Sequence, residues 1–219
     1  PFSITNQLSF TAWVYRYEKT CNSLCTIFHG ESGASSDAGN NGGFRIFIKQ
    51  NVLQYYAADG SVSAENSAYV ENGWEVPFLE WVHVGIVHRD GIVSFYKNGR
   101  FYSKSNLEIG TDDISFNTGS HEHDYYTLGK FIRGGDEDAF KNYPYGSWFF
   151  HGRMHSVGVW NTAVSLKDIY NAMFSPAFLG GKAFWKMNET VGTTVKNLFS
   201  TNFDGGLGSN SVGNSVNAM

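Results

Sequence analysis

The chain has 219 residues, of which 42% are hydrophobic, 16% aromatic and 16% charged, and its formal net charge is −4. Lysine and arginine form no run that could neutralise a row of phosphates, so no nucleic-acid partner is expected. No stretch approaches the length of an apolar membrane span, so membrane insertion is not expected either. Many aromatic residues, 25 glycines and few charges suit strands joined by tight turns and predict an all-β protein.

Alternating side chains predict strands along most of the chain. In residues 8–15 the aliphatic and small residues share one face with Phe10, whereas Trp13 and Tyr15 share the other. Further strands are predicted at residues 26–28, 44–49, 52–56, 81–88, 92–96, 100–102, 125–132 and 148–160. Asp90-Gly91 and Asn98-Gly99 tolerate the positive φ angles of tight hairpin turns, so residues 81–102 are predicted to form a meander. Residues 59–79 are interpreted as a polar loop.

One segment has helical periodicity. In residues 165–173 the apolar side chains follow the i, i+3, i+4, i+7 pattern, and Ser165 with Asp168 forms a capping-box pattern. A single short helix after the last core strand excludes a parallel α/β sheet, because each parallel crossover needs a helix.

Four motifs in sequence resemble laminin-G-like jelly rolls of the concanavalin A-like lectin and glucanase superfamily. They are FTAWV at 10–14, the meander WVHV…SFYKNG at 81–99, LG at 128–129, and FHGRM…VGVWN…AVS at 150–165. The resemblance implies two antiparallel sheets packed as a jelly-roll sandwich over residues 1–182. It also implies a secreted or cell-surface protein that recognises a glycan or another extracellular protein.

Two departures from the family pattern affect the interpretation. His155-Ser156 stands where relatives often carry two acidic residues, so no role of that pair is transferred. Residues 183–203 contain FWKMNETVGTTV, which resembles the strand that begins such a domain. This segment either completes the sandwich or starts a following repeat, and its late position favours a truncated repeat. Residues 204–219 are rich in Gly, Ser and Asn and are predicted to be a flexible tail.

Loop residues are the candidates for a metal and a ligand. Asp136, Glu137 and Asp138 follow two glycines and could supply oxygen ligands to calcium; a solvated acidic loop is the alternative. Sugars stack on aromatic rings while polar neighbours bind their hydroxyls. The residues predicted on this basis to bind ligand are Trp74, Lys141, Asn142, Tyr143, Tyr145 and Trp148. The tryptophans on strands, Trp13, Trp81 and Trp160, are predicted to serve packing.

Cys21 and Cys25 are close enough for a small-loop disulfide, which an oxidising compartment would favour; two reduced core thiols are the alternative. The sequence has no E-x-D-x-E run that would place paired carboxylates on one strand face, and no G-x-S-x-G motif. A non-enzymatic recognition module is therefore the main expectation. The alternatives are a structural repeat of an adhesin or matrix fibre and, less favoured, a glycan-degrading enzyme. The sequence does not indicate an oligomeric state.

Overall fold

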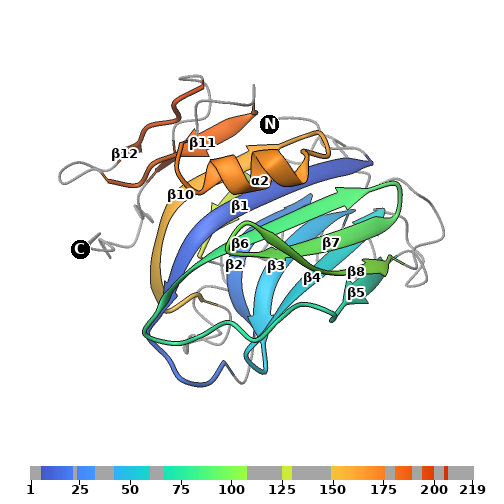
Figure 1. The fold of residues 1–219 in the computed structure, drawn as a ribbon, viewed down its shortest axis with the longest axis horizontal. Coiled ribbons are helices and arrows are strands. Elements are labelled where there is room, and N and C mark those ends of the chain that lie inside the picture. Colours follow the sequence, from blue (N-terminus) through green and yellow to red (C-terminus); the bar gives the residue numbers. More distant parts are fainter. Residues whose placement is uncertain are drawn as a thin grey trace.

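The protein is a sandwich of two antiparallel sheets, and the computed structural model describes residues 6–21, 24–32, 42–59, 67–107, 125–129, 149–175, 181–188, 194–199 and 205–206 (Figure 1). The six-stranded sheet has, in spatial order, β11 (Ala183–Trp185), β10 (Gly152–Trp160), β1 (Gln7–Arg16), β6 (Trp81–Arg89), β7 (Ile92–Lys97) and β8 (Arg100–Asn106). The five-stranded sheet has β5 (Ser67–Val70), β4 (Val52–Asp59), β3 (Gly42–Lys49), β2 (Cys25–Ser32) and β9 (Tyr125–Leu128). The predicted all-β jelly-roll sandwich is confirmed.

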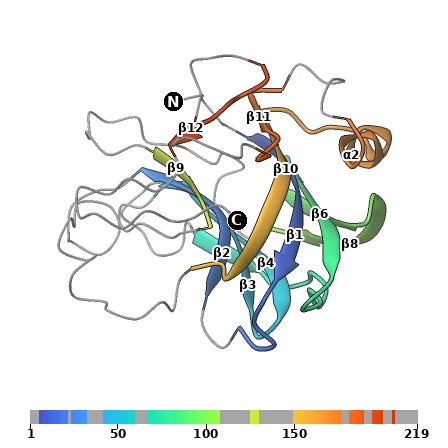
Figure 2. The same cartoon turned by 90° about the vertical axis from the view of Figure 1, so that its left-hand side faces the viewer.

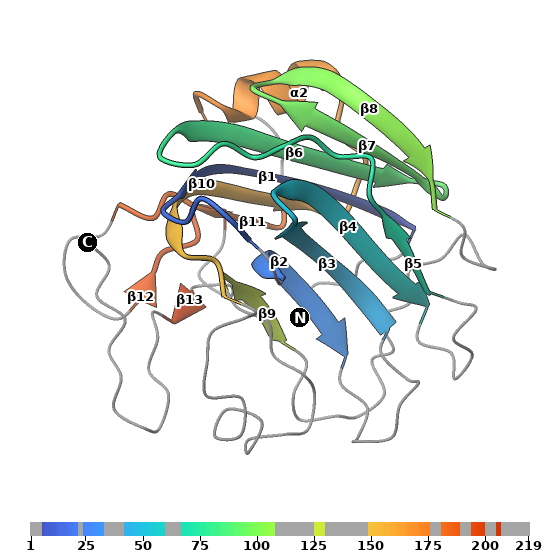
Figure 3. The same ribbon diagram turned by 90° about the horizontal axis from the view of Figure 1, so that it is seen from below.

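The core lies between the two sheets, which face one another in Figure 3. Alternation along β1 sends Leu8, Phe10, Ala12 and Val14 into this core, where each is fully buried. The Phe10 ring stacks on that of Phe28 in the opposite sheet at 5.1 Å between centroids. The face assignment made from the alternating pattern is therefore confirmed for β1.

The central meander β6–β7–β8 forms as predicted, with turns at the Asx-Gly pairs. Asp90 and Gly91 have φ of 49° and 70°, and Asn98 and Gly99 have φ of 49° and 71°. These angles suit the twist of the flanking strands. The β3–β4 hairpin turns at Gln50-Asn51, between the strands predicted at residues 44–49 and 52–56.

Two strands were not expected from the sequence. β4 continues to Asp59, and β5 (Ser67–Val70) pairs with it inside the segment that was interpreted as a loop. This edge strand of the described sheet is four residues long, and the polar residues that flank it in sequence, Glu65, Asn66, Glu71 and Asn72, hide it. Gly205-Gly206, in the predicted flexible tail, forms the short strand β13, which pairs with β12 (Thr194–Val195).

The segment after residue 182 contributes to the sandwich. β11 pairs with β10, and the side chains of Ala183 and Trp185 belong to the core. The boundaries of the predicted domains stay predictions.

The helix α2 (Leu166–Ala172) lies on the outer face of the six-stranded sheet (Figures 1 and 3). Ser165 and Asp168 form the predicted capping box. Ile169 packs on Val87 and Tyr96, and a Cβ at Gly85 would lie 3.1 Å from the Ile169 side chain, so the glycine permits the close approach. Among the described residues, no helix has the length and apolar composition needed to cross a bilayer.

Candidate functional site

The helix covers only part of the outer face of the six-stranded sheet. The connection before α2 is held at the start of β1, where the Ser9 hydroxyl accepts a hydrogen bond from the Val164 amide and the Gln7 side chain accepts one from the Ala163 amide. The other end of the helix reaches Trp13, whose indole Nε1 donates to the Met173 carbonyl over 3.1 Å. Figure 2 shows α2 at the level of the start of β1 and away from the loop that follows the strand. The outer face beyond Trp13 is therefore not covered by the helix.

Aromatic side chains occupy this uncovered end. On β1 and just after it, the outward positions hold Trp13, Tyr15 and Tyr17. The neighbouring strands place Trp81 of β6 opposite Tyr15, and His155 and Arg153 of β10 opposite Trp13 and Tyr15 respectively. We call this group the aromatic surface; it consists of Trp13, Tyr15, Tyr17, Trp81, Arg153 and His155.

The rings of the aromatic surface form one continuous row. Trp13 stacks on His155 at 5.9 Å between ring centroids, and His155 meets the edge of Trp81 at 4.8 Å. Trp81 contacts Tyr15 at 5.4 Å, and Tyr15 contacts Tyr17 at 5.6 Å. Each ring is thus held by its neighbours in a fixed orientation.

The row is open to solvent at one end and supported at the other. Tyr17 is 47% exposed and Trp81 is 37% exposed, whereas Trp13, Tyr15 and His155 are half-buried. Arg153 is exposed; its Nε donates to the Tyr17 hydroxyl, and its guanidinium carbon lies 5.7 Å from the Tyr17 ring centroid. Ordered apolar ring faces therefore lie beside polar groups that can exchange hydrogen bonds.

The histidines at the inner end of the row are neutral at neutral pH. His83 of β6 lies against Trp13 with 5.5 Å between ring centroids and is fully buried. Burial, with a smaller effect of the nearby His155, lowers the pKa of His83 to about 3. Burial also lowers the pKa of His155.

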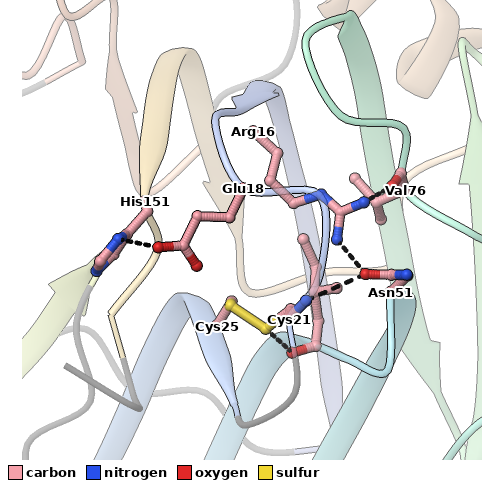
Figure 4. The surroundings of a disulfide bond; sticks show 8 residues. Arg16, Glu18, Cys21, Cys25, Asn51, Val76 and His151 are labelled. Carbon is pink, nitrogen blue, oxygen red and sulfur yellow. Dashed lines mark hydrogen bonds and ion pairs between the residues drawn. A yellow bond between two sulfur atoms is a disulfide. The ribbon is translucent and has the colours of Figure 1, made fainter. Parts of the chain in front are cut away.

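A disulfide anchors the loop that continues from Tyr17 (Figure 4). The predicted bond between Cys21 and Cys25 is present. Asn51, in the β3–β4 turn, accepts hydrogen bonds through Oδ1 from Arg16 Nη1 at 2.6 Å and from the Cys21 amide at 3.1 Å. Arg16 Nη2 also donates to the Val76 carbonyl at 2.7 Å. The turn of one sheet thereby fixes the end of β1 in the other.

Replacing Asn51 by glycine should lower the free energy of unfolding by about 1–3 kcal/mol, because the buried Arg16 guanidinium and the Cys21 amide lose an acceptor. Glycine keeps the positive φ of 68° without strain. The matched control is Gln50→Gly, since Gln50 is exposed and has a φ of 51°. Urea unfolding that shows equal stability for the two variants would contradict a role of the Asn51 side chain.

A second aromatic group lies on the outer face of the five-stranded sheet. The rings of Tyr56 and Tyr69 are 4.7 Å apart, and the Arg45 guanidinium lies 5.2 Å from the Tyr56 ring centroid. Arg45 and Phe47 are buried, whereas Tyr69 is 55% exposed and Phe149, which pairs with Thr26 beside Phe47, is 38% exposed.

Comparison with known proteins identifies the family. Residues 1–170 match the sequence model of the concanavalin A-like lectin/glucanases superfamily. The chain belongs to this superfamily. The match covers more than half of the chain and includes all the motifs on which the resemblance was based. No curated protein matches the chain.

Solved structures with the superfamily's fold are similar to this chain at low sequence identity. A Bacteroides ovatus protein proposed to bind carbohydrate is 18% identical, with a TM-score of 0.60 over 90% of this chain and 51% of its own. A pentraxin from Limulus polyphemus is 18% identical over 77% of this chain and 72% of its own, with a TM-score of 0.48. Domain 4 of an extracellular arabinanase from Geobacillus stearothermophilus, solved with arabinotriose, is 17% identical over 78% and 68%, with a TM-score of 0.47. This chain spans about half the length of the Bacteroides protein, and the likeness concerns the fold.

Of the residues predicted to bind ligand or metal through the loops, Trp74 is the one that lies among the described residues. Its side chain is 2% exposed, and it lies in the core with Lys97 Nζ 4.8 Å from its ring centroid. This burial argues against the prediction that Trp74 binds ligand; the polar neighbours in sequence hide the fact that the fold buries the ring. The other predicted ligand and metal residues, Asp136, Glu137, Asp138, Lys141, Asn142, Tyr143, Tyr145 and Trp148, lie outside the described residues. Among the described residues, no three His, Cys, Asp or Glu side chains are grouped as metal ligands.

Trp13 and Trp81 were assigned to packing from the sequence, but the superfamily fold places both on the aromatic surface. Trp160, assigned in the same way, is buried. One sequence signal for the aromatic surface was available, because Trp13 and Tyr15 lie opposite the aliphatic face of β1. The contribution of Trp81 depends on strand pairing and on how far α2 extends, and neither follows from local pattern.

Proposed function

We propose that the chain is a non-enzymatic module that binds carbohydrate through the aromatic surface. One observation carries the proposal: a row of mutually oriented aromatic rings lies on the outer face of a sheet, and α2 leaves it uncovered at the end where Tyr17 and Trp81 are exposed. Membership of a superfamily of lectins and glucanases, and a fold shared with a Bacteroides protein proposed to bind carbohydrate, support it.

The chemistry of the surface suits a sugar. The C–H groups on one face of a pyranose form an apolar patch that packs on an aromatic ring, and the hydroxyls around its rim need donors and acceptors. Arg153 and the Tyr17 hydroxyl supply such groups beside the exposed rings. Rings that are already ordered lose little conformational entropy when a ligand binds.

The predicted calcium dependence and extracellular location belong to the same proposal. Asp136, Glu137 and Asp138 supply the oxygen atoms that calcium prefers, and the Cys21–Cys25 disulfide fits an oxidising compartment. The alternative, which the sequence left open, is that the chain recognises an extracellular protein through other loops.

A glycan array followed by calorimetric titration of the glycans that bind tests the proposal. Saturable binding is expected, and Trp81→Ala should weaken it at least tenfold, which corresponds to about 1.4 kcal/mol. Trp81→Phe should retain part of the affinity because it keeps an aromatic face. Parallel arrays with calcium and with a chelator determine whether the ion contributes.

Two control variants remove exposed aromatic rings elsewhere. Phe174, 71% exposed after α2, and Tyr69, 55% exposed on the other sheet, should each be replaceable by alanine without loss of affinity. Loss of binding in Tyr69→Ala but not in Trp81→Ala would move the site to the five-stranded sheet. Absence of any saturable signal would instead favour a structural repeat.

A further inference from the structure

The aromatic surface is longer than one sugar ring. Trp13, Tyr15 and Tyr17 occupy alternate positions along an extended segment, so about 13 Å separates the Cα atoms of the first and the last. The Tyr17 amide donates to the His151 carbonyl at 2.9 Å, which keeps the chain paired with the neighbouring segment one residue beyond β1. The three rings contributed by β1 and the residue just after it therefore follow the strand direction, while His155 and Trp81 flank them on the neighbouring strands.

The ring-to-ring contacts make the row continuous. Successive centroids from Trp13 through His155, Trp81 and Tyr15 to Tyr17 lie 4.8 to 5.9 Å apart. A pyranose is about as large as one tyrosine ring, so a single sugar can cover only one side chain of the row. Several sugars in line are needed to cover the row.

Both ends of the row are marked by polar groups. At the Trp13 end the indole N–H is already bonded to the Met173 carbonyl, and the helix limits extension in that direction. At the Tyr17 end, Arg153 donates to the Tyr17 hydroxyl, and Glu18 Oε1 lies 2.6 Å from His151 Nδ1 (Figure 4). The open end thus has hydrogen-bonding groups that can receive a terminal sugar or let the chain continue.

We propose that the ligand is an extended oligosaccharide of at least three sugars, bound with consecutive sugars over Trp81, Tyr15 and Tyr17, so that it crosses from β6 to β1 and then follows β1. This inference rests on the proposed carbohydrate-binding function and adds its ligand class and direction. Each sugar adds one ring contact, so affinity depends on the number of sugars until the row is filled.

Calorimetric titration with linear β-1,4-linked gluco-, xylo- and manno-oligosaccharides of one to six sugars tests the inference on the full chain. In the series that binds, affinity should rise at least tenfold from one to three sugars and then level off. Tyr17→Ala should remove most of the gain from the last sugar while it changes affinity for the shorter ligand less than twofold. Phe174→Ala is the control and should leave the whole length profile unchanged.

The outcomes separate the inference from the proposed function. Equal affinity for one sugar and for six, weakened by Trp81→Ala, would overturn the extended ligand but retain a carbohydrate site. A length dependence that Tyr17→Ala does not alter would show that the chain runs in another direction and would also overturn it. No binding in any of these series or on the glycan array would remove the proposed function itself.

Discussion

Replacing Trp74 with alanine is expected to lower the free energy of unfolding by about 3–5 kcal/mol, a large share of the stability of a domain. The ring is 2% exposed and packs in the core beneath the Lys97 ammonium group. Its backbone carbonyl accepts a hydrogen bond from the Leu53 amide at 3.0 Å, which ties this segment to β4. Truncation would leave a cavity that these fixed neighbours cannot fill. Urea unfolding monitored by circular dichroism measures the change.

Trp81 provides a matched control because it is the same residue type in the opposite environment. With 37% of its surface exposed on the outer face, Trp81→Ala should reduce stability far less than Trp74→Ala. The two variants should therefore separate stability from binding: Trp74→Ala should lower the free energy of unfolding, whereas Trp81→Ala should lower the affinity for glycan. If the Trp74→Ala protein were as stable as the unaltered protein but no longer bound glycan, Trp74 would instead belong to the ligand site.

Acid is expected to destabilise the domain between about pH 6.5 and pH 3, because two buried histidines are neutral in the folded state. Burial lowers the pKa of His83 to about 3 and that of His88 to about 4. The unfolded chain takes up protons at these groups below its own histidine pKa, and the folded chain does not. The contribution of these two histidines to the free energy of unfolding is thus fully present above pH 6.5, and it is lost as the pH decreases towards their folded pKa values. Each histidine should contribute a loss of roughly 2.5 kcal/mol at pH 4.5.

The His83→Gln variant isolates this effect. Its stability should depend less steeply on pH between 7.5 and 4.5 than that of the unaltered protein, even if it is less stable at both values. His151→Gln is the control, since the His151 side chain is 46% exposed beside Glu18. Urea unfolding at a series of pH values gives the slopes; identical slopes for His83→Gln and the unaltered protein would show that His83 does not couple folding to protonation.

The sequence pattern predicted those parts of the fold that depend on interactions between residues close together in the chain. Period-2 alternation in β1 separated Leu8 and Phe10 from Trp13 and Tyr15, and the Asx-Gly pairs located the turns of the meander. The Ser165 capping box was also visible in sequence because all its hydrogen bonds lie within four residues. Such features need no knowledge of distant segments.

The candidate site was not predicted because its features depend on long-range contacts. Trp74 is surrounded in sequence by Glu71, Asn72 and Glu75, yet the strand that buries it lies some twenty residues earlier. Conversely, Trp81 has the pattern of a packed strand residue, and only the end of α2 near Trp13 decides that its face stays uncovered. Whether an aromatic ring binds a ligand or fills the core is settled by what the rest of the fold places over it.

The position of β1 in its sheet determines when this strand can fold during synthesis. It lies between β6 and β10 and pairs with both, although β10 ends only at Trp160. At translation rates of about 5–20 residues per second, the nascent strand waits roughly 10–30 s for its second partner to emerge from the ribosome. During that interval the face that carries Leu8 and Phe10 has no complete sheet to join. The order of elements along the chain therefore makes completion of the six-stranded sheet a late step that depends on contacts between residues far apart in sequence.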